Sequence, residues 1–233
     1  PINQKDCNNR VAIILPNFNS EKYILSTIHS VKKQSYKNWE LIIVDDCSNI
    51  ETKKKLKKFI RNRKIKIFWL KKNQGAAYCR NLAIDKSKSR FIAFIDSDDI
   101  WEKNKLNQQV KFMLKNNYDL TYTNYKTFGF KNKKINSPRK FTFDTFTKNT
   151  SIGTSTMMIR RKIIKGIKFT KTEICEDYFF KCKILKKIKF AYCIEKYLTK
   201  YRIRNNSLQS SRLRNFYWIW KINRKYNKFN FFQ

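Results

Sequence analysis

Glycine, proline and histidine are scarce in this sequence, and the patterns they usually form are missing. Its 233 residues include four glycines, three prolines and one histidine. No Gly-x-Gly-x-x-Gly or Walker A pattern occurs, so a dinucleotide cofactor and a P-loop NTPase are disfavoured. The six cysteines form no Cys-x-x-Cys pair, which argues against a zinc site or a disulfide framework and favours reduced thiols.

Long apolar segments are missing as well. No stretch approaches the roughly 20 apolar residues that a membrane-spanning helix requires. Residues 1–10 are polar and lack the apolar centre of a signal peptide. We therefore expect a cytoplasmic protein, either free or held peripherally at the inner face of the cytoplasmic membrane.

Acidic residues are few: 17 Asp and Glu stand against 53 Lys and Arg, for a net charge of +36. One interpretation is an anionic partner, such as nucleic acid, a membrane surface or a phosphate-bearing substrate. The other is a compositional drift toward residues with AT-rich codons, such as Lys, Asn, Ile, Phe and Tyr. The drift is favoured because the lysines are scattered through every segment.

Short apolar runs alternate with segments of helical periodicity in the first part of the chain. The runs span residues 11–15, 41–44, 65–70 and 91–95, and the helical segments span about 20–34, 52–62 and 76–86. This alternation predicts a parallel sheet with right-handed crossover connections.

The pattern then changes. A helix is expected at about 103–116, followed by strands at 118–125, 156–159 and 190–193, a loop at 131–140 and a helix at 177–187. We interpret this half as completing the same sheet. The predicted fold class is therefore α/β: a Rossmann-like mixed sheet of mostly parallel strands, flanked by helices, in a single domain.

Polar residues follow each of the four apolar runs. In open α/β sheets, ligands bind beyond the carboxyl ends of the strands. Adjacent carboxylates repel, and a divalent cation carrying a diphosphate relieves that repulsion. Oxygen ligands without His or Cys favour Mg²⁺ or Mn²⁺. The strand-end segments are Pro16-Asn17-Phe18-Asn19, Asp45-Asp46, Asn73-Gln74-Gly75 and Asp96-Ser97-Asp98-Asp99.

A plainer interpretation is that these aspartates cap the helices that follow. It fits Asp99, which precedes the helix expected at 103–116. It does not explain the other carboxylates of the motif, nor Asp45.

Taken together, four segments resemble the family 2 glycosyltransferases, and their order and spacing match across residues 11–101. The resemblance implies a GT-A fold, a nucleoside-diphosphate sugar donor, most often UDP, and inversion at the anomeric carbon. The segments are Val11-Ala-Ile-Ile-Leu-Pro-Asn-Phe-Asn19, Trp39-Glu-Leu-Ile-Ile-Val-Asp-Asp-Cys-Ser48, Asn73-Gln-Gly-Ala-Ala-Tyr-Cys-Arg-Asn81 and Phe94-Ile-Asp-Ser-Asp-Asp99.

The resemblance also implies roles for individual residues on the donor side. Asp46 is expected to accept a hydrogen bond from the base, and Arg80 to face the nucleotide or its phosphates. Asp98 or Asp99 is the expected direct ligand of a Mn²⁺ or Mg²⁺ cofactor. The implied nucleotide-sugar-binding residues are Pro16, Asn17, Asn19, Asp46, Gly75, Arg80, Asp96, Ser97 and Asp98.

The second half resembles the family less tightly. Gly153-Thr-Ser-Thr-Met-Met-Ile-Arg-Arg161 is similar to its acceptor-side strand, which places Thr154 near the acceptor. The pair Glu176-Asp177 resembles its Glu-Asp motif, in which the Asp is the general base. Inversion requires one carboxylate to take the proton of the acceptor hydroxyl, which suits Asp177. The alternative is that Asp177 only caps its helix.

One departure concerns the segment Tyr201-Arg-Ile-Arg-Asn-Asn-Ser207, which resembles a segment that commonly carries His where Arg204 stands. An arginine can clamp a phosphate but cannot act as a metal ligand or proton shuttle. We therefore place Arg202 and Arg204, with Thr154 and Glu176, on the acceptor or phosphate side.

These assignments divide the domain into a nucleotide-sugar-binding half (1–116), an acceptor-binding half (117–212) and a basic, aromatic tail (213–233). For the tail, two interpretations stay open. A basic amphipathic helix with aromatic residues is typical of a membrane interface, here an anionic one. The same aromatic residues also suit a helix that packs on the body of the protein.

The predicted function is transfer of a hexose or N-acetylhexosamine from a UDP-sugar to a glycan or glycolipid, in polysaccharide and cell-envelope synthesis. The charge suits a nucleic-acid-binding protein too, but carboxylates along the strand ends repel phosphates, so no specific nucleic-acid partner is expected. A non-catalytic membrane scaffold is disfavoured by the intact motifs. A sugar nucleotidyltransferase is disfavoured because residues 15–19 form no Gly-rich loop.

Overall fold

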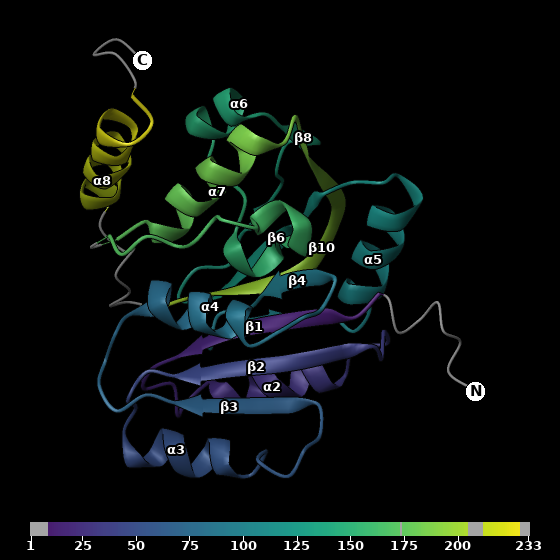
Figure 1. Cartoon of the computed structure of the whole chain (residues 1–233), viewed down its shortest axis with the longest axis vertical. Helices are drawn as coiled ribbons and strands as arrows, with labels where there is room; N and C mark the ends of the chain where they lie inside the picture. Colours follow the sequence, from purple (N-terminus) through teal and green to yellow (C-terminus); the bar gives the residue numbers. More distant parts are fainter. Residues whose placement is uncertain (1–8, 173, 205–211, 229–233) are drawn as a thin grey trace.

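We describe a computed structural model of the chain, in which residues 9–172, 174–204 and 212–228 are described. One ten-stranded sheet runs through the molecule in the order β3-β2-β1-β4-β9-β6-β10-β5, with β7 paired to β6 and β8 to β10. Helices cover both faces of this sheet (Figure 1). The mixed α/β single domain predicted from the sequence is confirmed.

The first half is a parallel sheet with crossover helices. Its parallel strands are β1 (Val11–Asn17), β2 (Trp39–Asp45), β3 (Ile65–Trp69) and β4 (Phe91–Phe94). Between them lie α2 (Ile24–Lys32), α3 (Ile50–Lys57) and α4 (Ala76–Asp85). Each crossover connection returns the chain to the amino-end edge of the sheet, so the strands run parallel and the four strand-end segments meet at the opposite, carboxyl-end edge.

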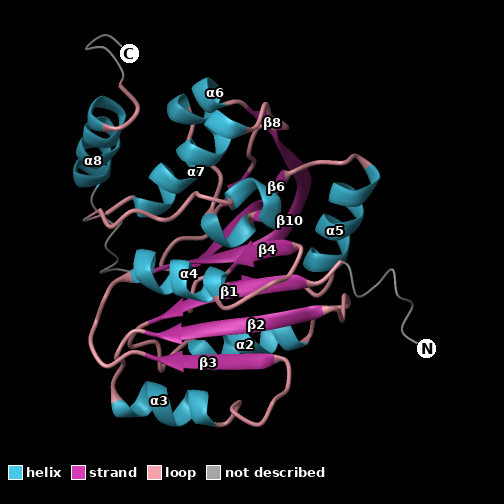
Figure 2. Cartoon of the chain, in the orientation of Figure 1, coloured by secondary structure: helices cyan, strands magenta, loops and turns pink. Residues whose placement is uncertain are grey.

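Strand β1 shows why this half is buried on both faces. Its side chains alternate between two hydrophobic clusters. Ala12 and Ile14 join the cluster beneath α4, whereas Ile13 joins the cluster beneath α2. The two helices lie on opposite faces of the sheet (Figure 2). The near-continuous apolar runs in the sequence are the consequence of this double coverage.

The second half extends the sheet with antiparallel and parallel strands. Strand β9 pairs antiparallel with β4 and β6, and β10 runs parallel to β6. The strands are β5 (Ile100–Trp101), β6 (Leu120–Gly129), β7 (Lys134–Ile135), β8 (Lys140–Phe141), β9 (Met158–Arg160) and β10 (Ala191–Ile203). The helices are α5 (Lys105–Lys115), α6 (Phe143–Lys148), η1 (Thr154–Thr156), η2 (Arg161–Ile164), α7 (Glu176–Lys187) and α8 (Arg212–Lys225).

Several expected elements differ from the observed ones. The first helix begins at Ile24 rather than near residue 20, after a turn. The expected loop at 131–140 contains β7, and α6 was not predicted. The strand expected at 190–193 continues to Ile203, because its polar second half pairs with β6 through two register shifts. A strand stabilised by such pairing has no apolar alternation to reveal it.

The tail was expected either to contact a membrane or to pack on the body of the protein, and α8 shows the packing on one of its faces. One face packs on the body: Ile222 is fully buried, the Tyr178 hydroxyl donates to Asn223 Oδ1 at 2.7 Å, and the rings of Phe179 and Tyr226 lie 4.6 Å apart. The helix stands beside α7 (Figure 1). Another face is exposed, as described below. Residues 229–233 of the predicted tail, and residues 205–207 of the segment after Arg204, lie outside the described residues.

We expect Ile222→Ala to lower the free energy of unfolding by about 2–4 kcal/mol, because it removes fully buried methyl groups that hold α8 on the core. Urea denaturation measures this change. The matched control is Phe216→Ala on the same helix, whose side chain is 72% exposed and whose loss should stay within about 0.5 kcal/mol. Equal effects of the two substitutions would contradict the observed docking of α8.

Candidate active site

The ends of β1 and β2 carry a buried hydrogen-bond network. Asn17 Nδ2 donates to Asp45 Oδ1 at 2.7 Å, and the backbone N–H of Ser48 donates to Asp45 Oδ2 at 3.1 Å. Asn19 adopts a left-handed backbone with φ of 44°, and its N–H donates to the Ser48 hydroxyl at 3.0 Å. Pro16 lies within β1 beside these residues. The network shapes the loop that the sequence assigned to the nucleotide.

Asp46 has a structural role that sequence reasoning missed. Its two carboxylate oxygens accept the backbone N–H groups of Gln74 and Gly75 at 2.7 and 2.8 Å. Gly75, at φ of 87°, then starts α4 in a conformation that other residues rarely adopt. Asp46 therefore fixes the loop before α4. Each oxygen retains a second lone pair, and recognition of a base by Asp46 stays a prediction.

The acidic motif lies where β4 ends, and its carboxylates differ in environment. Asp96 is partly exposed and forms an ion pair with Arg80, whose Nη2 lies 2.8 Å from its carboxylate. Asp98 is buried and forms an ion pair with Arg204, whose Nε lies 2.9 Å from its carboxylate. Burial raises the pKa of Asp98, against the opposing charge of Arg204. The Ser97 carbonyl accepts the hydroxyl of Thr27 at 3.1 Å, which ties the motif to α2.

Asp99 is fully buried. Its Oδ1 accepts the backbone N–H of Arg202 at 2.9 Å, and its Oδ2 has no hydrogen-bond partner among the described residues. Burial and the neighbouring Asp96 and Asp98 raise its pKa well above the usual value. Asp99 does not cap the following helix, because α5 begins at Lys105 with Asn104 at the capping position. It anchors β10 to the motif.

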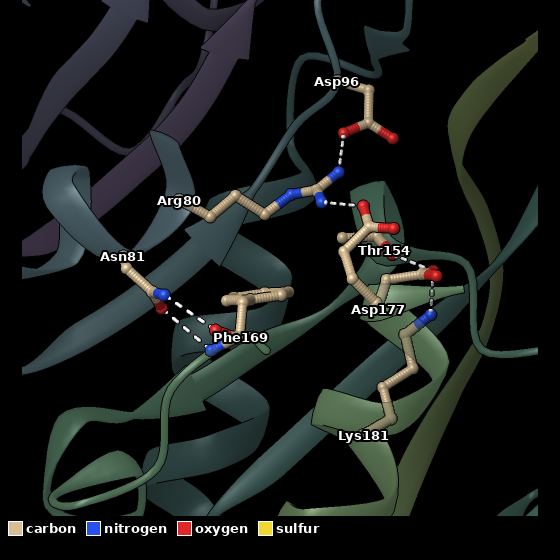
Figure 3. Close-up of polar contacts among 8 residues, drawn as sticks. Arg80, Asn81, Asp96, Thr154, Phe169, Asp177 and Lys181 are labelled. Carbon is tan, nitrogen blue, oxygen red and sulfur yellow. Dashed lines mark hydrogen bonds and ion pairs between the residues drawn. The ribbon is translucent and has the colours of Figure 1, made fainter. Parts of the chain in front are cut away.

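Arg80 joins the two halves of the domain. Its guanidinium donates to Asp96 Oδ1 and to Glu176 Oε1, both at 2.8 Å, and lies 5.3 Å from the ring centre of Phe169 (Figure 3). Asn81, the next residue of α4, exchanges two hydrogen bonds of 2.8 Å with the backbone of Phe169. Arg80 is 5% exposed. Its contact with a phosphate stays a prediction.

Asp177 sits in the first turn of α7 and does not cap it, because Cys175 occupies the capping position. The Thr154 hydroxyl and Lys181 Nζ both donate to its Oδ2 at 2.7 Å (Figure 3). Burial raises the pKa of this carboxyl, but the charge and hydrogen bond of Lys181, the charge of Arg80 and the bond from Thr154 outweigh it. The resulting pKa lies far below the usual range.

Asp177 and Asp96 line one pocket of about 250 Å³. It also contains residues of β6, β10, α7 and α8, among them Tyr125, Tyr201, Lys181 and Asn215. A wider cleft of about 470 Å³ lies near the amino ends of β2, β3 and β4 and is lined mainly by cationic side chains. Because the predicted acid–base and phosphate-binding residues gather at the carboxyl ends, the smaller pocket is the candidate active site.

A set of buried polar contacts holds the segment η1 in place, for which a position near the acceptor stays a prediction. Trp101 Nε1 donates to the Ser155 carbonyl at 2.8 Å, and Gln109 Nε2 donates to the Thr156 carbonyl at 3.0 Å. Lys105, which is fully buried, donates to Gln109 Oε1 at 2.6 Å and lies 4.0 Å from the Trp101 ring centre. The sequence signal for these contacts is a lysine and a glutamine on the apolar face of α5.

Among the described residues, no three His, Cys, Asp or Glu side chains are grouped so that they could hold a metal ion without other ligands. Mg²⁺ and Mn²⁺ in nucleotide sites take one or two carboxylates and complete their coordination with phosphate and water. Asp96 and Asp98 fit that donor set. Asp99 fits it poorly, because its side chain is fully buried.

The fold and the site together define a class: an α/β sheet with an acidic motif at its strand ends, facing a further carboxylate across one pocket, is the arrangement of a GT-A glycosyltransferase. The chain belongs to glycosyl transferase family 2, because the sequence profile of that family matches residues 12–189.

Two bacterial relatives match nearly the whole chain. TuaG of Bacillus subtilis (strain 168), named provisionally as a teichuronic acid biosynthesis glycosyltransferase, is 35% identical over 226 residues, which are 95% of this chain and 90% of the relative. WfgD of Escherichia coli is named a UDP-Glc:alpha-D-GlcNAc-diphosphoundecaprenol beta-1,3-glucosyltransferase. It is 36% identical over 215 residues, which are 91% of this chain and 84% of the relative.

A solved structure supports the fold. S. aureus TarS 1-349, in complex with UDP-GlcNAc, has a TM-score of 0.78 and 23% identity to this chain. The match covers 91% of this chain and 65% of that one, so TarS has a substantial part that this chain does not span. The predicted family, GT-A fold and glycosyltransferase class are thereby confirmed. The roles of single residues stay predictions.

Proposed function

We propose that the protein transfers a hexose or N-acetylhexosamine from a UDP-sugar to a hydroxyl of a glycan or glycolipid, with inversion at the anomeric carbon. The observation that carries this proposal is that Asp96, from the strand-end motif, and Asp177, from α7, line the same pocket. The side of the pocket that carries Asp96 suits the sugar donor, and the side that carries Asp177 suits the acceptor. The reaction named for the Escherichia coli relative, from UDP-glucose to a lipid-linked GlcNAc, supports a UDP-sugar donor and a glycolipid acceptor.

Asp177 is the general base of the proposed reaction. It takes the proton of the acceptor hydroxyl while the hydroxyl oxygen bonds to the anomeric carbon and the bond from that carbon to the diphosphate breaks. Attack and departure occur on opposite faces of the sugar, which inverts its configuration. Thr154 orients the carboxylate through its hydrogen bond to Oδ2. Glu176 acts through Arg80, which it holds beside Asp96.

The diphosphate side relies on Asp96, Asp98 and the arginines of the β10 segment. A Mn²⁺ or Mg²⁺ ion held by Asp98 would stabilise the negative charge of the departing diphosphate. Arg204 pairs with Asp98, and Arg202 Nε donates to the Asp98 carbonyl at 3.0 Å. Both guanidinium groups therefore lie close to the proposed phosphate position, where they would clamp phosphate oxygens.

Metal-dependent UDP binding tests the donor site. Calorimetric titration of UDP at physiological salt should give a heat that requires Mn²⁺, and Asp98→Asn should weaken binding by at least about tenfold, equivalent to about 1.4 kcal/mol. The matched control is Asp85→Asn, which removes the same charge from an exposed position at the end of α4. Binding that ignores both the metal and Asp98 would mean that the basic surface merely attracts phosphate.

Transfer itself tests the base. Asp177→Asn should lower the rate of sugar transfer by about 10²- to 10⁴-fold, because the amide cannot take the hydroxyl proton. The assay uses UDP-glucose and UDP-GlcNAc with a GlcNAc-diphospholipid acceptor. Binding of UDP by the variant, measured by the same calorimetry, shows that its donor site is intact. Transfer at the wild-type rate would remove Asp177 from its proposed role.

A glycolipid acceptor implies contact with a membrane surface, and α8 offers a suitable face. Leu213, Phe216, Tyr217 and Trp220 recur at helical spacing and are exposed. Lysines and arginines accompany them, including Lys221 at 4.5 Å from the Trp218 ring centre and Arg224 at 5.5 Å from that of Trp220. No helix in the described ranges is both long and apolar enough to cross a bilayer. The proposed contact is peripheral, on anionic lipid.

Vesicle flotation tests this contact. The double variant Phe216→Ser/Trp220→Ser should reduce association with phosphatidylglycerol vesicles several-fold, because burial of aromatic side chains at the interface is lost. The matched control is Ile60→Ser/Phe130→Ser, which removes two hydrophobic side chains exposed elsewhere to a comparable degree. Equal retention of both double variants on the vesicles would mean that net charge alone accounts for binding.

A further inference from the structure

A lysine lies beside the proposed base in a position where burial makes its charge costly. Lys181 follows Asp177 by one helical turn of α7 and is 3% exposed. Its ammonium reaches Asp177 Oδ2 at 2.7 Å and lines the same pocket. A buried ammonium is tolerated when a carboxylate compensates it. Among the described residues, Asp177 is the carboxylate with which Lys181 forms an ion pair.

The two oxygens of Asp177 are not equivalent. Oδ2 accepts both Lys181 Nζ and the Thr154 hydroxyl, each at 2.7 Å. No hydrogen bond to Oδ1 is found within the described ranges. Two donors on one oxygen fix the plane of the carboxylate and leave the other oxygen to the pocket. Oδ1 is therefore the atom suited to meet an acceptor hydroxyl.

The charges around Asp177 come from several elements. The charged groups that line its pocket or act on it electrostatically are Lys181 of α7, Arg80 of α4 and Asp96 of the strand-end motif. Glu176 precedes Asp177 in α7 and pairs with Arg80. The neutral titratable groups that line the pocket are Cys175, Tyr178, Tyr125 and Tyr201. Burial raises the pKa of each of these phenols and of the thiol, so they stay neutral near pH 7. The guanidinium of Arg80 forms ion pairs with Asp96 and Glu176. In the part of the chain that the structure describes, Lys181 is thus the cation that bonds Asp177 directly.

From this geometry we infer that Lys181 is a positioning residue for the base: it holds Oδ2, directs Oδ1 to the acceptor and keeps the carboxylate ionised. The inference rests on the proposed function of Asp177. During transfer the hydroxyl proton moves to Oδ1, and the diphosphate leaves with the electrons of its bond to the sugar. Lys181 then lies buried beside a neutral acid, which favours release of the proton to solvent and resets the base.

This arrangement has a defined pH dependence. A general base works only when ionised, so activity is lost as the pH falls through its pKa. With Lys181 present, the pKa of Asp177 lies far below its usual value, and the base stays ionised throughout the usual assay range. Without Lys181, the charge of Arg80 and the hydrogen bond from Thr154 still oppose the effect of burial. We therefore expect the pKa of Asp177 to rise, to its ordinary value of about 4 or above.

The decisive experiment compares Lys181→Met with Lys183→Met, which removes the same charge from the same helix. Within the described part of the chain, Lys183 donates to the Lys168 carbonyl and the Thr170 hydroxyl and pairs with no carboxylate. Carbon-13 NMR titration of the aspartate carboxyl groups measures the pKa of Asp177 without any substrate. Transfer from UDP-glucose to the GlcNAc-diphospholipid is measured in parallel from about pH 5 to pH 9.

We expect the pKa of Asp177 to rise by about three to five units in Lys181→Met, and the activity to gain an acidic limb that wild type and Lys183→Met lack. Lys181→Arg should restore the wild-type profile, since it keeps the charge and a donor. Thr154→Val, which removes the other donor to Oδ2, should shift the pKa less. If Lys181→Met does not fold, Lys181→Gln, which removes the charge but keeps a polar side chain, is titrated in its place, with the same expected rise of the Asp177 pKa.

If the pKa of Asp177 is unchanged in folded Lys181→Met, or if the pH profile of its activity gains no acidic limb, the inference is overturned. The proposed role of Asp177 as the base would still stand. Loss of the base assignment itself is a separate outcome, shown by full transfer in Asp177→Asn. The two failures are therefore distinguishable.

Discussion

The rest of the site depends on the double ion pair of Arg80. Its buried guanidinium bonds Asp96, at the end of β4, and Glu176, at the start of α7. A buried charge is tolerated only when opposite charges and hydrogen bonds compensate it. Folding must therefore bring both carboxylates to the same point. That requirement places the first turn of α7, and with it Asp177, against the edge of the sheet where the donor motifs end.

The acidic residues of this very basic protein are concentrated in one place, which a drift in composition does not explain. Seven of its 17 acidic residues lie at this one edge: Asp45, Asp46, Asp96, Asp98, Asp99, Glu176 and Asp177. Drift toward lysine explains the surplus of cations but not this concentration. Several of the carboxylates are held by cations from other elements, as Asp98 is by Arg204. Others, such as Asp46, hold backbone amides and so shape the loops around the pocket.

Much of the fold follows from local pattern. The apolar runs at 11–15, 41–44 and 91–95 predict buried parallel strands because a strand covered on both faces has no polar side. The strand-end motifs then indicate the family, and the family implies Asp177. The sequence did not predict the short strand β5, the helix α6 or the second half of β10. Their stability comes from neighbouring strands and helices, as in the pairing of Thr199 with Trp101.

The sequence by itself determined the parallel half of the sheet, the edge at which its polar residues gather and the glycosyltransferase class. Only the tertiary structure decided which groups pair there: Arg80 with Glu176, Arg204 with Asp98, and Asp99 with the backbone of Arg202. It also decided that one face of α8 packs on the core while another stays exposed. The physical reason is the sequence separation of the interacting residues. Periodicity reports contacts between near neighbours in the chain, whereas ion pairing and burial depend on residues that meet only when the sheet is complete.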